Sequence, residues 1–252
     1  MPAHTEVREA VPADTHSIRK MLEADDPEDY VPDVIEKWIE NREVFVAVRS
    51  GSVAGMAHYE RMPDGTIWLS GLRVAGSLRR TGVGRALSRK MTSIPGSEVF
   101  RLMISSTNKP SVQLSVQEGF KCRCTVSVWR QESEAAEPGL KEAAVQTAEM
   151  DYLKNFDGLL PTAWFAFVPD GTISSKLKKF GLRYVRDRHG NTFLMNTHEK
   201  SLTPLHADKD AFNSIPRGYV LLAARDESLE NFGLRKTLWT ESVGIFEYHR
   251  ER

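Results

Sequence analysis

The sequence predicts an α+β protein built in two parts. Over the first 130 residues, helix-like and strand-like patterns follow one another in the order α-α-β-β-β-α-β-α-β, and strand-like patterns dominate the second half. An acidic, small-residue segment at 131–139 lies between the parts and ends in the turn pair Pro138-Gly139. The chain has 252 residues, 40% of them apolar, which suffices for one large core or two modest ones. We therefore expect a domain at 1–130, a linker at 131–139 and a C-terminal α+β domain at 140–252.

Each element of the first part follows from a local pattern. Apolar residues at helical spacing indicate helices, and β-branched or aromatic runs between turn signals such as Ser50-Gly51 indicate strands. In chain order these are helices at 12–22 and 34–40, strands at 44–49, 53–61 and 66–74, a helix at 82–91, a strand at 98–105, a helix at 110–117 and a strand at 121–130. In the second part the same patterns predict a helix at 140–153 and strands at 163–168, 192–196, 218–224 and 243–249.

Charge is unevenly distributed although the formal net charge is zero. Residues 23–36 contain seven acidic side chains and no Lys or Arg, whereas residues 65–97 contain six basic side chains and no acidic one. The neutral balance argues against a surface built to bind nucleic acid or anionic lipid. The basic stretch suits an anionic cofactor, and the acidic stretch suits a cationic acceptor.

The connection between the strand at 66–74 and the helix at 82–91 carries the clearest chemical signal. Gly82 and Gly84 allow backbone N–H groups to turn toward an anion, and the helix N-terminus adds partial positive charge. Arg79, Arg80 and Arg85 add charged donors, so we expect a phosphate or pyrophosphate site here. A Walker loop would need Lys followed by Ser or Thr after the second glycine, where this chain has Arg85-Ala86.

The pattern Arg79-x-x-Gly82-x-Gly84 resembles the acetyl-CoA pyrophosphate loop of the GCN5-related N-acetyltransferases (GNAT). The downstream strand at 100–105, Asn108, Leu114 and Gly119-Phe120 resemble the next block of that family, and the resemblance covers about the first half of the chain. It implies a GNAT fold with a mixed, mostly antiparallel sheet and an N-acetyltransferase that takes its acetyl group from acetyl-CoA. For the pantetheine part of the cofactor, it implies contacts from Leu72, Arg73, Val74 and Asn108. For the pyrophosphate, it implies contacts from Arg79, Arg80, Thr81, Gly82, Val83, Gly84 and Arg85.

Two catalytic positions depart from the pattern of the family. Where many members carry a Tyr on the helix at 110–117 to protonate the departing thiolate, this chain has Ser115. The acid is then Ser115 acting through water, a tyrosine from elsewhere, or solvent. Where some members place a carboxylate on the third strand, this chain has none, and Glu60 and His58 on the neighbouring strand are the candidate bases.

On the acceptor side, the resemblance makes Asp29, Tyr30 and Asp33 candidate contacts and Trp38 a candidate wall. The two-part arrangement, with Asp29-Tyr30-Val31-Pro32 and then Trp38, is also similar to the histidine N-acetyltransferases. That likeness implies a free amino acid as acceptor and a second half that is a GNAT-like domain without the CoA loop, since no Gly-x-Gly follows Gly84. We therefore expect a small-molecule primary amine as acceptor. A protein N-terminal or lysine acetyltransferase is the alternative enzyme, and a non-catalytic acyl-CoA sensor or scaffold is the alternative of another class.

Cysteine content and hydropathy bear on the cellular setting. Cys122 and Cys124 are the only cysteines, too few for a disulfide framework, and residues 1–20 carry no signal-peptide pattern. No apolar run approaches the ~20 residues of a membrane span. We expect a cytoplasmic protein with no metal site and no membrane or nucleic-acid partner; the sequence carries no signal for its oligomeric state.

Overall fold

The computed structural model describes residues 4–131, 139–169, 177–207, 211–224, 229–232, 234–236 and 242–250. The chain divides into two compact units. Unit 1 comprises Met1–Arg101, Gln113–Phe120 and Tyr248–Arg252, and unit 2 comprises Leu102–Val112 and Lys121–Glu247. The boundaries 1–130 and 140–252 remain a prediction, and residues 132–138 of the expected linker lie outside the described residues.

The elements up to residue 131 follow the predicted order, with one addition at the N-terminus. They are β1 (Thr5–Glu9), the 3₁₀ turn η1 (Pro12–Asp14), α1 (Thr15–Asp25), α2 (Val31–Glu40), β2 (Val44–Arg49), β3 (Ser52–Arg61), β4 (Ile67–Val74), η2 (Gly76–Leu78), α3 (Val83–Thr92), β5 (Val99–Ser105), α4 (Lys109–Gln117) and β6 (Lys121–Gln131). The addition is β1, which pairs with β2 from Thr5–Arg49 to Glu9–Phe45.

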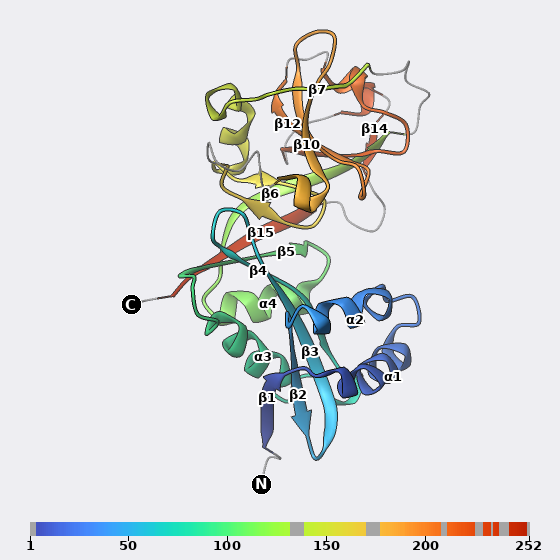
Figure 1. The fold of residues 1–252 in the computed structure, drawn as a ribbon, viewed down its shortest axis with the longest axis vertical. Coiled ribbons are helices and arrows are strands. Elements are labelled where there is room, and N and C mark those ends of the chain that lie inside the picture. The colour runs from blue at the N-terminus through green and yellow to red at the C-terminus, as the bar shows by residue number, and fades with distance from the viewer. Residues whose placement is uncertain are drawn as a thin grey trace. The chain divides into compact units, whose positions relative to one another are not determined.

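The sheet of unit 1 has helices on both faces. Strands β1 to β4 are antiparallel neighbours, and β4 and β5 are parallel. On one face, Ile18 of α1 and Ile35 of α2 share a buried cluster with Val46 and Met56. On the other face, α3 lies so close to Gly55 that a Cβ there would be 3.1 Å from Leu87 and from Val83. Figure 1 shows α1 and α2 on one side of β2 and β3 and α3 on the opposite side.

Strands β4 and β5 pair only at their beginning. Their register joins Ile67 to Phe100 and Trp68 to Arg101. A buried ion pair stabilises this end of the strand pair. The Arg101 guanidinium donates to Asp64 at 2.7 Å, and Arg101 is only 4% exposed. Further along, Gly71 (φ +59°) and its successor stand opposite the single residue Ala57, which makes a β-bulge in β4. Because a bulge bends its strand, β4 runs on to Val74 with no strand on its outer edge among the described residues.

The second half contains mainly short elements. They are β7 (Lys141–Glu142), η3 (Thr147–Glu149), η4 (Asp151–Phe156), β8 (Leu160–Pro161), β9 (Ala166–Phe167), η5 (Lys178–Phe180), β10 (Leu182–Arg186), β11 (Thr192–Asn196), β12 (Ser201–His206), η6 (Ala211–Ser214), β13 (Val220–Ala224), η7 (Glu230–Phe232), β14 (Leu234–Lys236) and β15 (Ser242–His249). The helix expected at 140–153 is wrong: its first residues pair with β10 as β7, and η3 and η4 follow. The strand expected at 163–168 is reduced to β9, whereas β11 has its predicted bounds.

The strand order of unit 2 repeats that of unit 1. Strands β7, β10, β11 and β12 are antiparallel neighbours, as β1 to β4 are, and β12 then pairs in parallel with β13. This parallel pair also joins only two positions, Ser201 to Val220 and Leu202 to Leu221. Strand β6 pairs in antiparallel fashion with β13 on one side and with β15 on the other. No helix in the described ranges has the length and apolar character needed to cross a membrane.

Candidate functional site

The loop between β4 and α3 presents a row of backbone N–H groups without partners. The first helical bond of α3 runs from the Ala86 N–H to the Gly82 carbonyl at 3.0 Å, and the preceding N–H groups, those of 80–85, have no hydrogen-bond partner among the described residues. Arg80 (φ +62°) and Gly82 (φ +93°) are left-handed, and such residues turn successive N–H groups toward one side. With the partial charge of the helix N-terminus, these groups form a cradle for an anion such as a pyrophosphate.

The two glycines of the loop are favoured for different reasons. A Cβ at Gly82 would have open space around it, but φ +93° strains any L-residue. At Gly84 the limit is space, because a Cβ there would lie 3.3 Å from Leu114 on α4 and 3.6 Å from Val74. The first turn of α3 therefore lies directly against the end of β4.

The arginines of the loop differ in their partners. Arg79 donates to the Val74 carbonyl at 3.3 Å and to the Asp25 carboxylate at 3.1 Å. Arg85 forms an ion pair with Glu118 at 2.9 Å. The exposed Arg80 has no partner among the described residues, which leaves its charge for a ligand.

One basic residue at this loop was missed by the sequence-based prediction. Arg49, the last residue of β2, donates to the Thr81 hydroxyl at 2.8 Å, and Thr81 in turn donates to the Leu78 carbonyl at 2.7 Å. No local motif marks Arg49, because its contact spans 32 positions of sequence. It adds a second cation beside the N–H row.

The acidic and basic stretches meet at the end of β4. Arg73 donates to both carboxylate oxygens of Asp29, at 2.7 and 3.2 Å, and the Asp29 side chain is only 5% exposed. The Arg73 guanidinium also lies 5.8 Å from the ring centre of Tyr30, which is 53% exposed. Of the predicted acceptor contacts, Tyr30 is therefore open to solvent, whereas Asp29 holds the α1–α2 connection onto β4.

A buried histidine lies under Trp38. The His58 and Trp38 rings stack with centres 3.8 Å apart, and Trp38 also covers the bulge at Gly71, where a Cβ would be 3.2 Å from its ring. His58 Nδ1 is 2.8 Å from Ser70 Oγ, and Nε2 is 3.7 Å from Glu43 with no hydrogen-bond partner in the described part of the chain. Burial lowers the pKa of His58 below 6.5 despite the opposing effect of Glu43, so the ring is neutral at pH 7.

The other predicted residues lie on three different elements. Glu60 is half-buried on β3 opposite Trp68, and Ser115 is 7% exposed on α4. Asn108 belongs to unit 2, where its side chain accepts the Ser111 N–H at 3.3 Å at the start of α4. Leu72 and Val74 lie in the part of β4 beyond its pairing with β5.

The cysteines lie on β6, away from this loop in sequence. Cys122 is exposed, whereas burial raises the pKa of the Cys124 thiol to about 12. Across the described residues, no group of three His, Cys, Asp or Glu side chains is arranged to hold a metal ion.

The segment that carries this loop matches a known protein family. The family model of the acetyltransferase (GNAT) family matches residues 13–120, which include β4, the N–H row and α3. Residues 13–120 are a GNAT acetyltransferase domain. Members of this family transfer acetyl groups from acetyl-CoA to amines. No curated protein matches the sequence significantly.

Solved structures extend the likeness to the whole chain. A candidate acetyltransferase from Thermoplasma acidophilum is 19% identical with a TM-score of 0.63, covering 97% of this chain and 99% of its own. One from Pyrococcus horikoshii is 16% identical with a TM-score of 0.61, covering 98% and 90%. A GCN5-related N-acetyltransferase from Sphaerobacter thermophilus is 14% identical with a TM-score of 0.56, covering 97% and 95%. At these identities the likeness shows a shared fold.

Proposed function

We propose that the chain is an acetyl-CoA-dependent N-acetyltransferase that transfers the acetyl group directly to the primary amine of a small molecule. The observation that carries this proposal is the row of N–H groups at 80–85, which no described group of the protein satisfies. The first N–H groups of any α-helix lack intrahelical partners, and here the N–H groups of the preceding loop join them, so that a diphosphate would meet donors at the density it requires.

The donor side would be built from main chain and two cations. Residues 80–85 would bind the pyrophosphate, with Arg80 and Arg49 adding charge, and the edge at Leu72–Val74, along which no described strand pairs, would hold pantetheine. Arg79 and Arg85 would first have to leave Asp25 and Glu118, so their contribution would be smaller. Asn108 remains a predicted pantetheine contact. When bound, acetyl-CoA supplies the activated acyl group as a thioester.

For removal of the amine proton we propose a relay that consists of Ser70, His58 and Glu43. The amine nitrogen would give its proton to Ser70 Oγ, whose own proton passes to His58 Nδ1 across the 2.8 Å hydrogen bond. Glu43, 3.7 Å from Nε2, would stabilise the resulting imidazolium. The relay is needed because His58 is only 4% exposed under Trp38, whereas Ser70 on β4 is partly exposed.

Glu60 stays the alternative base, and Ser115 acting through water stays the candidate acid. A thiol with a reference pKa of about 8.5 leaves readily as thiolate, so the acid is the less demanding role. General-base help is typically worth about 10²–10⁴-fold in rate.

For the acceptor we propose a free amino acid. The likeness to the histidine N-acetyltransferases supports this class, and the exposed carboxylate of Asp33 in the acidic stretch 23–36 would attract the ammonium form of an amine toward the exposed Tyr30. The Trp38 ring is stacked on His58 and would form a wall of the acceptor site.

The test is a thiol-release assay with the full chain, acetyl-CoA and three acceptor sets: free amino acids, polyamines, and peptides with a free N-terminus or lysine. We expect turnover with at least one amino acid and none with peptides. Turnover with peptides alone would establish the protein acetyltransferase, and CoA binding without turnover on any acceptor would establish the non-catalytic sensor.

Three variants separate the proposed roles. Ser70→Ala should lower kcat by about 10²-fold or more, the usual contribution of a general base, with KM for acetyl-CoA unchanged. Ser88→Ala, which removes a buried hydroxyl on α3, is the matched control and should keep kcat. If Glu60→Gln is the variant that loses kcat, the base is Glu60. An acetyl group found on Ser70 by mass spectrometry would contradict direct transfer.

A further inference from the structure

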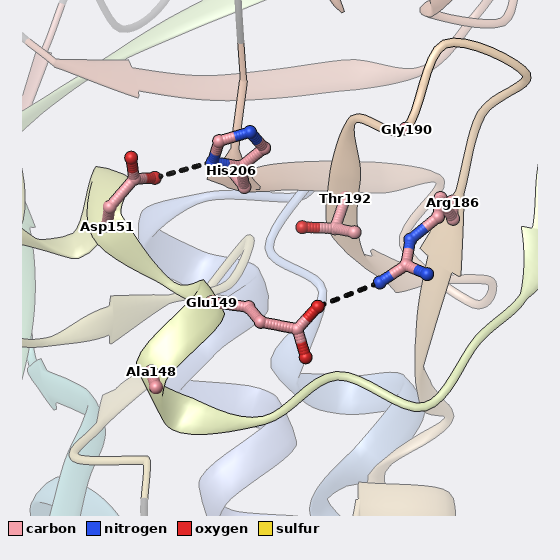
Figure 2. A pocket seen from close by; sticks show the side chains of 7 residues that line it. All are labelled: Ala148, Glu149, Asp151, Arg186, Gly190, Thr192 and His206. Atoms are coloured by element: carbon pink, nitrogen blue, oxygen red, sulfur yellow. Dashed lines mark hydrogen bonds and ion pairs between the residues drawn. The ribbon is translucent and has the colours of Figure 1, made fainter.

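Unit 2 contains a polar cavity of its own, of about 540 Å³. Figure 2 shows the polar residues that line it: Glu149 and Asp151 lie on the 3₁₀ segments η3 and η4, and Arg186, Thr192 and His206 lie on β10, β11 and β12. The volume falls within the range of small-molecule sites. None of these residues belongs to the GNAT domain at 13–120.

Strand register explains why the three sheet residues converge. Arg186 is directly opposite Thr192 in the β10–β11 pair, and Thr192 is directly opposite His206 in the β11–β12 pair. Directly opposed residues of neighbouring strands project from the same face of a sheet. A guanidinium, a hydroxyl and an imidazole therefore form one row across three strands.

Two donors in this row lack partners. Thr192 is 1% exposed, and its Oγ1 is buried without a hydrogen bond to any described residue; the same holds for Arg186 Nε. A buried hydroxyl without a partner is costly and uncommon in folded proteins. The Arg186–Glu149 pair beside them is 40% and 45% exposed, and exposed ion pairs open easily. Opening this pair would give a ligand access to both donors.

The charges select the kind of ligand. Arg186 donates to Glu149 at 3.0 Å, and His206 is 3.0 Å from Asp151. An anion bound to Arg186 in place of Glu149 would leave the Glu149 carboxylate without a countercharge. A cation bound to Glu149 in place of Arg186 would leave the guanidinium without one. A ligand that carries both charges can insert into the pair and leave neither alone. We propose that this cavity binds a free α-amino acid, with its carboxylate on Arg186 and Thr192 and its ammonium on Glu149.

The repeated strand order gives the cavity of unit 2 a counterpart position in unit 1. In unit 1, the helices between the first and second strands bring Asp29 to Arg73 at the end of the fourth strand. In unit 2, η3 and η4 likewise follow the first strand of the repeat, β7, and bring Asp151 to His206 at the end of the fourth, β12. The cavity thus lies at the position that corresponds to the proposed acceptor side, in a unit whose sequence has no CoA loop.

The experiment measures binding rather than turnover. The twenty common L-amino acids are titrated into the full chain by calorimetry, with propionate and ethylamine as probes that carry one charge. We expect at least one amino acid to bind and both single-charge probes to fail. Thr192→Val should weaken that binding at least tenfold, the loss typical of one hydrogen bond to a charged group, and should not lower stability because the hydroxyl it removes has no partner.

Matched variants keep this result separate from the acceptor site. Thr203→Val removes a threonine hydroxyl on β12 that donates to the Pro161 carbonyl, so it should cost stability but leave binding unchanged. Tyr30→Ala alters the proposed acceptor side in unit 1 and should also leave this binding unchanged. The proposal is overturned if no amino acid binds, if Thr192→Val and Arg186→Gln both bind as the wild type does, or if Tyr30→Ala alone abolishes binding.

Discussion

Replacing Arg80 by Gly should change stability and cofactor affinity in opposite directions. Arg80 has φ +62°, a conformation that costs an L-residue roughly 1–2 kcal/mol and costs glycine almost nothing. Against this gain, glycine has more freedom in the unfolded chain, worth about 0.4–1 kcal/mol. Arg80→Gly should therefore leave the free energy of unfolding unchanged or raise it by up to about 1.5 kcal/mol.

The same substitution removes the unpaired cation of the loop. A hydrogen bond to a charged group contributes about 1.5–3 kcal/mol, and exposure of Arg80 places it at the lower end, which corresponds to about a tenfold weaker Kd for CoA. Calorimetry gives the Kd, and urea unfolding gives the stability. The loss should shrink as salt is raised, because the contact is charged and exposed.

Arg42 provides a matched control. It has the same φ of +62° and is exposed, but it lies in the turn after α2, where its partner is Glu9. Arg42→Gly should leave the Kd for CoA unchanged. If Arg80→Gly keeps CoA affinity within twofold of the wild type, or if Arg42→Gly weakens it equally, the placement of the pyrophosphate at residues 80–85 is wrong.

Three further predictions concern stability and reactivity. Asp64→Asn should cost about 3–5 kcal/mol of unfolding free energy in urea, because it removes the negative charge that neutralises the buried Arg101 guanidinium; a loss below about 1 kcal/mol would mean that the pair is not buried in solution. Because the native pKa of His58 is below its unfolded value of 6.5, its neutral form contributes stability that is complete above pH 6.5 and lost as pH falls through the native pKa. His58→Phe should therefore flatten the pH dependence of unfolding below 6.5, and an unchanged slope would contradict a buried imidazole. At pH 8 a thiol reagent should label the exposed Cys122 and spare Cys124, because burial raises the pKa of the Cys124 thiol to about 12; rapid labelling of both, measured by mass spectrometry, would show that β6 opens.

Local patterns were enough to predict most elements of unit 1. The β-branched and aromatic run Val44–Arg49 and the turn that follows it are encoded in adjacent residues, and β2 has the predicted bounds. β1 was missed because Thr5–Glu9 is largely charged and becomes a strand only through its pairing with β2. The helix at 140–153 failed for the opposite reason: its Ala and Glu residues favour a helix, but pairing of Lys141 and Glu142 with β10 takes precedence.

In the candidate site, too, the features set by adjacent residues could be predicted, and the contacts between distant residues could not. The glycines of the loop could be predicted because a turn into a helix is a local event, and Gly82 does cap α3 in a left-handed conformation. The charged stretches were interpreted as separate sites for cofactor and acceptor, yet Arg73 pairs with Asp29 across 44 positions. Contacts at such separations depend on the tertiary fold, as does the stacking of His58 on Trp38, and no local pattern reports them.

The row of N–H groups at 80–85 also serves as a built-in reporter. Amide hydrogens that no protein group accepts exchange with solvent deuterium quickly, whereas amide hydrogens of the central strands exchange only when the unit opens. A ligand that accepts these hydrogens would slow six neighbouring amides at once while leaving the rest of α3 unchanged. Deuterium uptake in this one peptide segment would therefore count occupied sites directly, for any CoA thioester or competitor and without any need to know the acceptor.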